Sequence, residues 1–218
     1  MTNIQKRILT SIFIFPLSMF FIVKGGNYIV SFLYAVLILG NFEAFSTFKR
    51  KTTIIFLDVI LVISLLSLLF LRNESASSYL LLIWIIILTI FSDIGGYVFG
   101  KVFRWRKLTS ISPNKTLSGV IGSFFFSILS VFFIGGIVSA IGPLNFEFFL
   151  KPKYFLLAII FSLVAQLGDI LISYLKRLEK IKDTGKILPG HGGIFDRIDG
   201  LMFVVIIAYF AYDLNLFP

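Results

Sequence analysis

Residues 79–98 read YLLLIWIIILTIFSDIGGYV, an apolar run in which Asp93 is the sole charged residue. About 20 helical residues are needed to cross the hydrocarbon core of a bilayer, so this stretch predicts a transmembrane helix. Comparable apolar runs recur along the whole chain. The predicted spans are Ile8–Val23, Tyr28–Phe45, Ile54–Leu71, Tyr79–Val98, Val120–Ile141, Tyr154–Tyr174 and Leu201–Phe217.

These runs are too long and too evenly apolar for barrel strands, whereas a helix satisfies its own backbone polar groups in lipid. We therefore predict an all-α fold, a polytopic bundle of about seven transmembrane helices. The composition agrees, because 58% of the residues are hydrophobic and only 14% are charged, against about 25% charged residues in soluble proteins. No soluble segment can be separated, so residues 1–218 are expected to form one integral membrane domain.

The basic residues predict how the bundle is oriented. Lys and Arg concentrate in cytoplasmic loops, and a cytoplasmic N-terminus places most of the 20 basic residues on that side. The net charge of +9 is spread over several loops, which argues against a nucleic-acid partner and for contact with anionic membrane lipids. We expect a multi-pass protein of the cell membrane. The absence of cysteine excludes disulfides and thiol chemistry.

The densest polar stretch is residues 173–199, which read SYLKRLEKIKDTGKILPGHGGIFDRID on the predicted cytoplasmic side. Asp169, Ser173 and Lys176 share one helical face, since they are spaced by four and three residues. A carboxylate followed by a cation on one face suits a metal and a phosphate side by side. Any active site built from these residues would therefore face the cytoplasm.

Asp196 and Asp199 stand three residues apart at the start of the last predicted helix. Paired carboxylates suit Mg²⁺, which commonly takes one or two of them and completes its shell with substrate phosphates and water. The alternative is a charge pair that is favoured by the helix dipole. Asp93 and Asp169, near the cytoplasmic ends of two spans, are ligand candidates because ionisable groups are costly there. Asp58, inside a span with no motif nearby, is interpreted as a buried, hydrogen-bonded structural residue.

Two loops are candidates for phosphate binding. In the first, Lys186 precedes Gly190, Gly192 and Gly193, and glycine lets backbone amides approach a phosphate closely; a tight turn before the last span is the alternative. In the second, residues 112–116 read SPNKT, with Lys115 as the expected phosphate contact. A surface loop that only carries orienting charges is the alternative there.

The 173–199 stretch resembles the signature of the phosphatidate cytidylyltransferase (CDP-diacylglycerol synthase) family. The pattern is a serine, two residues, Lys-Arg, four residues, Lys-Asp, a Pro-Gly-His-Gly-Gly turn, and Asp-Arg-x-Asp. Upstream, the Asp93-Ile-Gly-Gly-Tyr97 stretch, the 112–116 loop and the Gly168-Asp169 pair resemble further motifs of that family. The resemblance is specific from about Asp93 to Asp199, whereas the N-terminal third matches in hydropathy alone.

The resemblance implies a site residue by residue. The implied catalytic residues are Ser173, Lys176, Arg177, Lys182, Asp183, His191 and Arg197. The implied substrate-binding residues are Ser112, Lys115, Thr116, Lys186, Gly190, Gly192 and Gly193. The implied metal ligands are Asp93, Asp169, Asp183, Asp196 and Asp199. The family often has acidic residues where this chain has Ser118 and Ile172, so neither position counts as a ligand.

The resemblance also implies the reaction of CTP with phosphatidate to give CDP-diacylglycerol and pyrophosphate, with Mg²⁺ as cofactor. A second cation and a homodimer are left open. His191, the single histidine, is assigned to phosphate contact. A transporter or channel is the rival from another class, but internal repeats and mid-span charges are not evident. A CDP-alcohol phosphotransferase would need an Asp-Gly-x-x-Ala-Arg motif that this chain lacks; a CTP-dependent lipid kinase or an isoprenoid cytidylyltransferase is harder to exclude.

Overall fold

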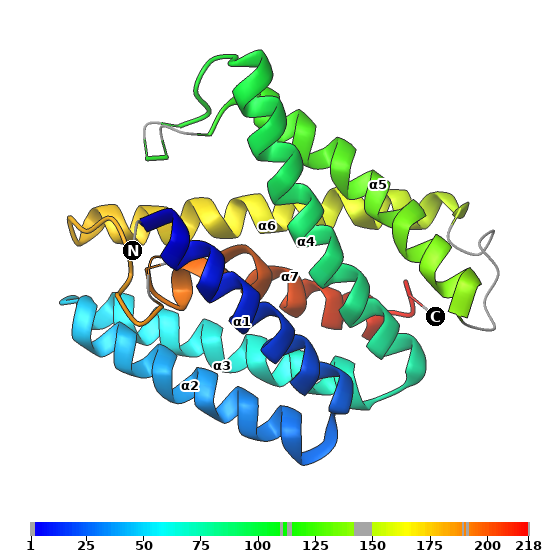
Figure 1. Ribbon diagram of the computed structural model, residues 1–218, viewed down its shortest axis with the longest axis horizontal. Coiled ribbons are helices and arrows are strands. Elements are labelled where there is room, and N and C mark those ends of the chain that lie inside the picture. Colours follow the sequence, from blue (N-terminus) through cyan, green and yellow to red (C-terminus); the bar gives the residue numbers. More distant parts are fainter. Residues whose placement is uncertain are drawn as a thin grey trace.

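The computed structural model describes residues 3–109, 111–112, 115–141, 150–188, 190 and 192–217. Within these ranges the chain forms seven helices and no strand longer than an isolated bridge. The helices are α1 (Asn3–Lys24), α2 (Gly26–Thr47), α3 (Lys51–Asn73), α4 (Ala76–Phe103), α5 (Leu117–Ile141), α6 (Pro152–Leu178) and α7 (Phe195–Asp213). The predicted all-α bundle is confirmed (Figure 1).

Each predicted span overlaps one of these helices; six lie within their helix, whereas the last predicted span, Leu201–Phe217, runs past the end of α7 at Asp213. Five of them, α2 to α6, contain a segment that is long and apolar enough to cross a membrane. The described side chains of α1 include the apolar stretch Ile12–Lys24, and α7 starts six residues before the predicted span with the charged sequence FDRID. The chain is therefore a multi-pass membrane protein, while the cytoplasmic position of its N-terminus remains a prediction.

Glycines bring α4 and α5 together along much of their length. A Cβ atom on Gly95 would overlap the carbonyl oxygen of Gly122, and one on Gly122 would overlap that of Gly95. One turn further, a Cβ on Gly119 would lie 2.9 Å from the carbonyl oxygen of Gly96. Small residues of this kind let helices approach closely in membranes, where packing drives their association. This hairpin carries the loop before α5, which projects from one end of the bundle (Figure 1).

The buried core has two parts that meet along α7. Trp84 lies at the centre of the larger part, fully buried against Tyr154, Phe161 and Phe217, and its indole nitrogen donates to the Ser130 hydroxyl at 3.1 Å. The smaller part joins α2, α3, α6 and the start of α7; its buried residues are Ala44, Phe48, Ile54, Leu57, Leu61, Ile172, Phe195 and Met202. This second cluster fixes the beginning of α7 against the C-terminal end of α2.

Candidate active site

Three aspartates from three helices meet at one end of the bundle. Asp93 of α4, Asp169 of α6 and Asp199 of α7 form a set that we call the clustered carboxylates. The carboxyl groups of Asp199 and Asp169 are within hydrogen-bonding reach of each other, and Asp93 is close enough to interact electrostatically with both. Carboxylates this close repel one another when all are charged. Nearby positive charge lowers this repulsion, and Lys115 supplies part of it.

Close packing of α6 on α7 brings two of these aspartates together. Gly168 precedes Asp169 and Gly200 follows Asp199. A Cβ on Gly168 would overlap the ring of Phe203, and one on Gly200 would lie 2.9 Å from the carbonyl oxygen of Ala165. The glycines beside the two aspartates thus permit the helix contact that makes them neighbours.

Lys115 connects the loop before α5 to this cluster. Its ammonium nitrogen lies 2.5 Å from Oδ2 of Asp169 and donates to the carbonyl oxygen of Gln166 at 3.3 Å. The loop is held by backbone bonds of 2.8 Å from Leu108 to Lys115 and 3.1 Å from Leu117 to Arg106. Lys115, predicted to contact phosphate, therefore lies at the clustered carboxylates. Its hydrogen bond to Gln166 joins two residues that are 51 positions apart in the sequence.

The residues beside Lys115 make hydrogen bonds that hold the loop and the start of α5. The Thr116 hydroxyl accepts from the Gly119 amide at 3.1 Å and lies 3.0 Å from the buried hydroxyl of Ser118, so it caps α5. The Ser112 carbonyl oxygen accepts from the Lys115 amide at 3.0 Å. Both predicted substrate contacts, Ser112 and Thr116, therefore shape the loop that carries Lys115; Pro113 and Asn114 lie outside the described residues.

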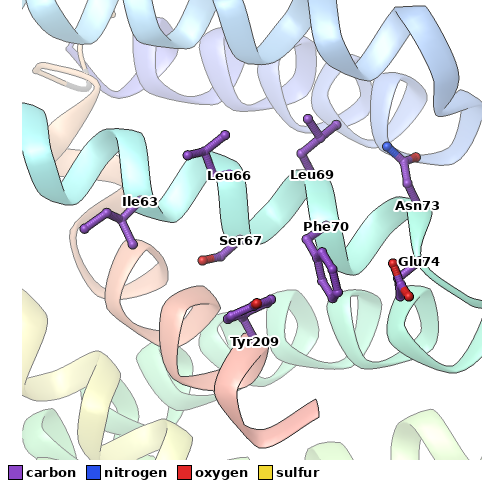
Figure 2. A pocket seen from close by; sticks show the side chains of 8 residues that line it. All are labelled: Ile63, Leu66, Ser67, Leu69, Phe70, Asn73, Glu74 and Tyr209. Carbon is purple, nitrogen blue, oxygen red and sulfur yellow. The ribbon is translucent and has the colours of Figure 1, made fainter. Parts of the chain in front are cut away.

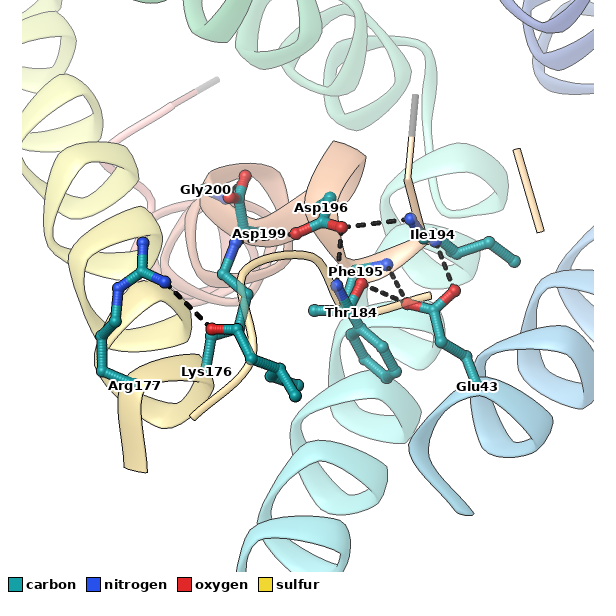
Figure 3. Close-up of polar contacts among 11 residues, drawn as sticks. Glu43, Lys176, Arg177, Thr184, Ile194, Phe195, Asp196, Asp199 and Gly200 are labelled. Carbon is teal, nitrogen blue, oxygen red and sulfur yellow. Dashed lines mark hydrogen bonds and ion pairs between the residues drawn. The ribbon is translucent and has the colours of Figure 1, made fainter. Parts of the chain in front are cut away.

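Asp196 has a different environment from Asp199, although both stand at the start of α7. Its Oδ1 pairs with Lys176 at 2.7 Å, and its Oδ2 accepts from the amides of Thr184 at 2.8 Å and Gly193 at 3.1 Å (Figure 3). Burial raises the pKa of the Asp196 carboxyl, but the bonds from Lys176, Gly193 and Thr184 outweigh burial and hold that pKa below its usual value. Both oxygens are thus engaged by the protein.

Glu43 was not predicted from the sequence as a site residue, but it contacts the loop before α7. It lies on α2 with 1% of its surface exposed, and its carboxylate accepts from the amides of Ile194 at 2.6 Å and Phe195 at 3.1 Å and from the Thr184 hydroxyl (Figure 3). A signal was present, because Glu43 is the only charged residue in the predicted span 28–45, and an ionisable residue within a span is by default functional.

A third buried carboxylate acts in the same way. The Glu179 side chain, 5% exposed at the end of α6, accepts from the amides of Lys49 at 3.4 Å and Arg50 at 3.0 Å. Glu43, Glu179 and Asp196 are called the anchoring carboxylates below. Each accepts hydrogen bonds from backbone N–H groups. These groups belong to a segment distant in the sequence or to a neighbouring turn.

The glycines of the α6–α7 loop also have a local explanation. Gly190 and Gly192 have φ angles of 78° and 89°, which side-chain-bearing residues rarely adopt. Leu188 and Gly192 exchange backbone bonds of 2.9 and 3.2 Å, which closes a tight turn. A Cβ on Gly193 would overlap Glu43 and Thr184. The turn interpretation therefore accounts for these glycines, and phosphate contact remains a prediction. His191 and Pro189 lie outside the described residues.

Some of the remaining signature residues are bonded or buried within the protein, and the others are exposed. Arg177 donates to the carbonyl oxygen of Ile181 at 2.9 Å, and Ser173 is buried on α6 one turn after Asp169. Lys182, Asp183 and Lys186 are exposed on the loop. Together with Phe42, Glu43 and neighbouring residues they line a cavity of about 730 Å³ between the end of α2 and the loop.

The predicted metal ligands do not form one group. In the described ranges, no three His, Asp or Glu side chains already converge as a metal centre. Asp196 anchors the loop, Asp183 is exposed, and only Asp93, Asp169 and Asp199 gather in one place. Arg197 contributes to the electrostatic environment of Asp93. Asp93, Asp169 and Asp199 are thus the predicted ligands that lie near one another, and metal binding by any of the five aspartates remains a prediction.

Two other features of α3 involve none of the predicted site residues. A cavity of about 560 Å³ opens between α3 and α7, lined mainly by apolar side chains such as Leu66, Phe70 and Tyr209 (Figure 2). It includes none of the predicted site residues. Asp58 on α3 was interpreted as a buried, hydrogen-bonded structural residue. The residue is half-buried, and its Oδ1 has no hydrogen-bond partner in the described part of the chain, so that interpretation is not supported.

Comparison with known proteins identifies the family. The model of the cytidylyltransferase family matches residues 48–215. A phosphatidate cytidylyltransferase of Rickettsia conorii is 33% identical over 217 residues, 95% of this chain and 90% of that protein. Proteins of the same name from Helicobacter pylori and Staphylococcus aureus are 42% and 41% identical over 56% and 57% of this chain, and these matches span 43% and 44% of their own lengths. The chain belongs to the cytidylyltransferase family.

Proposed function

We propose that this chain is a phosphatidate cytidylyltransferase at the cytoplasmic face of the cell membrane. A phosphate oxygen of phosphatidate attacks the α-phosphorus of CTP, the bond from that phosphorus to the bridging oxygen of the β-phosphate breaks, and pyrophosphate leaves as CDP-diacylglycerol forms. The observation that carries the proposal is the meeting of Asp93, Asp169 and Asp199 beside Lys115 at one end of a membrane bundle. The names of the relatives support the same reaction.

Two anionic substrates must approach each other, so the site has to supply positive charge. Lys115 lies at the carboxylate cluster, and Lys182 and Lys186 are exposed beside the cavity at the end of α2. We assign these three lysines and Arg197 to phosphate contacts, arginine being suited to bidentate binding. Lys176 and Arg177, predicted to bind phosphate, are already bonded to Asp196 and Ile181 and are assigned to support of the loop.

The clustered carboxylates fit Mg²⁺ in their chemistry. Asp169 and Asp199 present oxygens close enough to share a hydrogen bond, and Mg²⁺ needs only one or two carboxylates when substrate phosphates complete its shell. We propose that Asp169 and Asp199 hold the ion, with Asp93 beside them. When bound there, such an ion supplies neutralisation of the charge on the reacting phosphates.

The reaction does not require the protein to remove a proton from phosphatidate. The phosphate monoester of phosphatidate is anionic near neutral pH and can attack without a general base. The residues of the site are then required to bind, to orient and to shield charge. His191 keeps its proposed role in phosphate contact, and a homodimer remains a prediction.

The decisive experiment uses the purified protein with phosphatidate in mixed micelles and CTP that is labelled at either the α- or the γ-phosphate. We expect the α label to enter a lipid product that depends on phosphatidate and Mg²⁺, and the γ label to appear in pyrophosphate. Transfer of the γ label to lipid would instead show a lipid kinase. In a parallel reaction an isoprenoid phosphate replaces phosphatidate, and transfer of the α label to that lipid alone would contradict phosphatidate as the substrate.

A further inference from the structure

Glu43 is a buried charge in a helix that has no other. It is the only charged residue of α2 and is 1% exposed. A charged side chain in such surroundings is costly unless hydrogen bonds satisfy it. Its binding partners therefore show what this position contributes.

Those partners come from both ends of one loop. Oε1 accepts from the Thr184 hydroxyl and from the Phe195 amide at 3.1 Å, and Oε2 accepts from the Ile194 amide at 2.6 Å. Thr184 is fully buried, and a Cβ added to Gly185 would lie 3.0 Å from the Glu43 carboxylate. Residues 184 to 195 thus close on a single carboxylate that is at least 141 residues away in sequence.

The Glu43 carboxylate also caps the N-terminus of α7. The residue at the N-cap position is Ile194, and its side chain makes no capping hydrogen bond. The first N–H groups of a helix need acceptors, and a negative charge there interacts favourably with the helix dipole. Glu43 provides both, so its position sets the direction in which α7 begins. Asp199 follows about one turn later and faces Asp169.

We infer that Glu43 is a positioning residue of the active site. It holds the 184–195 loop and the first turn of α7, and through them it places Asp199 opposite Asp169 and the exposed Lys186 beside the cavity. The inference rests on the proposed function for its kinetic consequence, but the clamp itself can be tested without any activity.

Glu43→Gln is the direct variant, because the amide keeps the length but turns one acceptor into a donor that faces another donor. We expect kcat to fall by roughly ten- to a hundredfold, the scale of losing hydrogen bonds to a charged group, with KM for CTP and phosphatidate changed by less than about threefold. Glu179→Gln is the control, since Glu179 is another carboxylate with a largely buried side chain and binds amides outside this loop. Its kcat should stay within about twofold of wild type.

The second readout is hydrogen exchange of the backbone amides of residues 184–195, measured by mass spectrometry in detergent. Exchange should accelerate at least tenfold in Glu43→Gln and remain as in wild type in Glu179→Gln. Thr184→Val removes one donor while keeping the shape and should reproduce part of both effects, whereas Thr184→Ser should restore them. This pair decides the matter if Glu43→Gln does not fold.

Each result has a distinct meaning. Unchanged exchange and unchanged kcat in Glu43→Gln would overturn the inference. Faster exchange with unchanged kcat would make Glu43 structural only and would also overturn it. If the wild-type protein makes no CDP-lipid, the proposed function fails, and faster exchange would still show the clamp.

Discussion

The anchoring carboxylates and the clustered carboxylates lie at the same end of the bundle but have opposite surroundings. Glu43, Glu179 and Asp196 each accept hydrogen bonds from backbone amides, and Asp196 also pairs with Lys176. Asp169 and Asp199 face each other, and of the two it is Asp169 that pairs with Lys115. A carboxylate surrounded by donors stabilises the fold, while carboxylates that face one another destabilise it unless a cation joins them. Such unfavourable groupings are typical of functional sites.

The largest effect is expected for Asp199→Asn. Asparagine keeps the size but removes the charge, and a loss of about 3 to 4 kcal/mol of transition-state stabilisation lowers kcat by two to three orders of magnitude. Because a mutual repulsion is also removed, the melting temperature in detergent should not fall. Turnover is measured with labelled CTP and stability by thermal unfolding of the same preparation. Near-normal turnover with unchanged Mg²⁺ dependence would remove Asp199 from the site.

Asp196→Asn tests the other side of the comparison, because its main expected effect is on stability. The variant weakens the buried pair with Lys176 and one or both amide bonds, a loss of about 2 kcal/mol. The melting temperature should drop by about 5 °C for a chain of this size. If Asp196→Asn instead melts like wild type and loses activity like Asp199→Asn, Asp196 is a ligand and the division between the two sets is wrong.

Lys115→Ala should have an intermediate effect on substrate binding. Removal of the ammonium that lies against Asp169 takes a phosphate contact and leaves one more uncompensated negative charge. We expect KM for CTP to rise by about tenfold, the scale of a charge-assisted hydrogen bond. Lys107→Ala, an exposed lysine of the same loop, is the control and should bind CTP as wild type does. Equal kinetics for both variants at limiting CTP would place this loop outside the site.

The smallest effect on activity is expected from the variants that test orientation. Thr109→Cys and Asn215→Cys introduce single thiols into a chain without cysteine and should retain wild-type turnover. In intact cells an impermeant thiol reagent should label position 215 and spare position 109 until the membrane is permeabilised. The reverse pattern would put the clustered carboxylates on the outer face and contradict the proposed access to cytoplasmic CTP.

Much of the fold was predictable because hydrophobicity alone determines which segments can enter a membrane. The apolar runs located all seven helices, and errors were confined to their ends, as at α7, which begins at Phe195 rather than Leu201. The motif spacing also led to the end of the bundle at which Asp169 and Asp199 meet. The function of individual residues was less predictable, since Asp196 and Asp199 share a helix start but not an environment.

The sequence by itself determined the all-helical membrane class, the order of the helices and the segments that carry the chemistry, because these follow from local hydrophobicity and from a dense local motif. Only the tertiary structure separated the anchoring from the clustered carboxylates and showed the part played by Glu43. The reason is physical: the role of a carboxylate depends on which donors surround it. For Glu43 these donors lie 141 to 152 residues away, where helix packing rather than sequence spacing decides the distance.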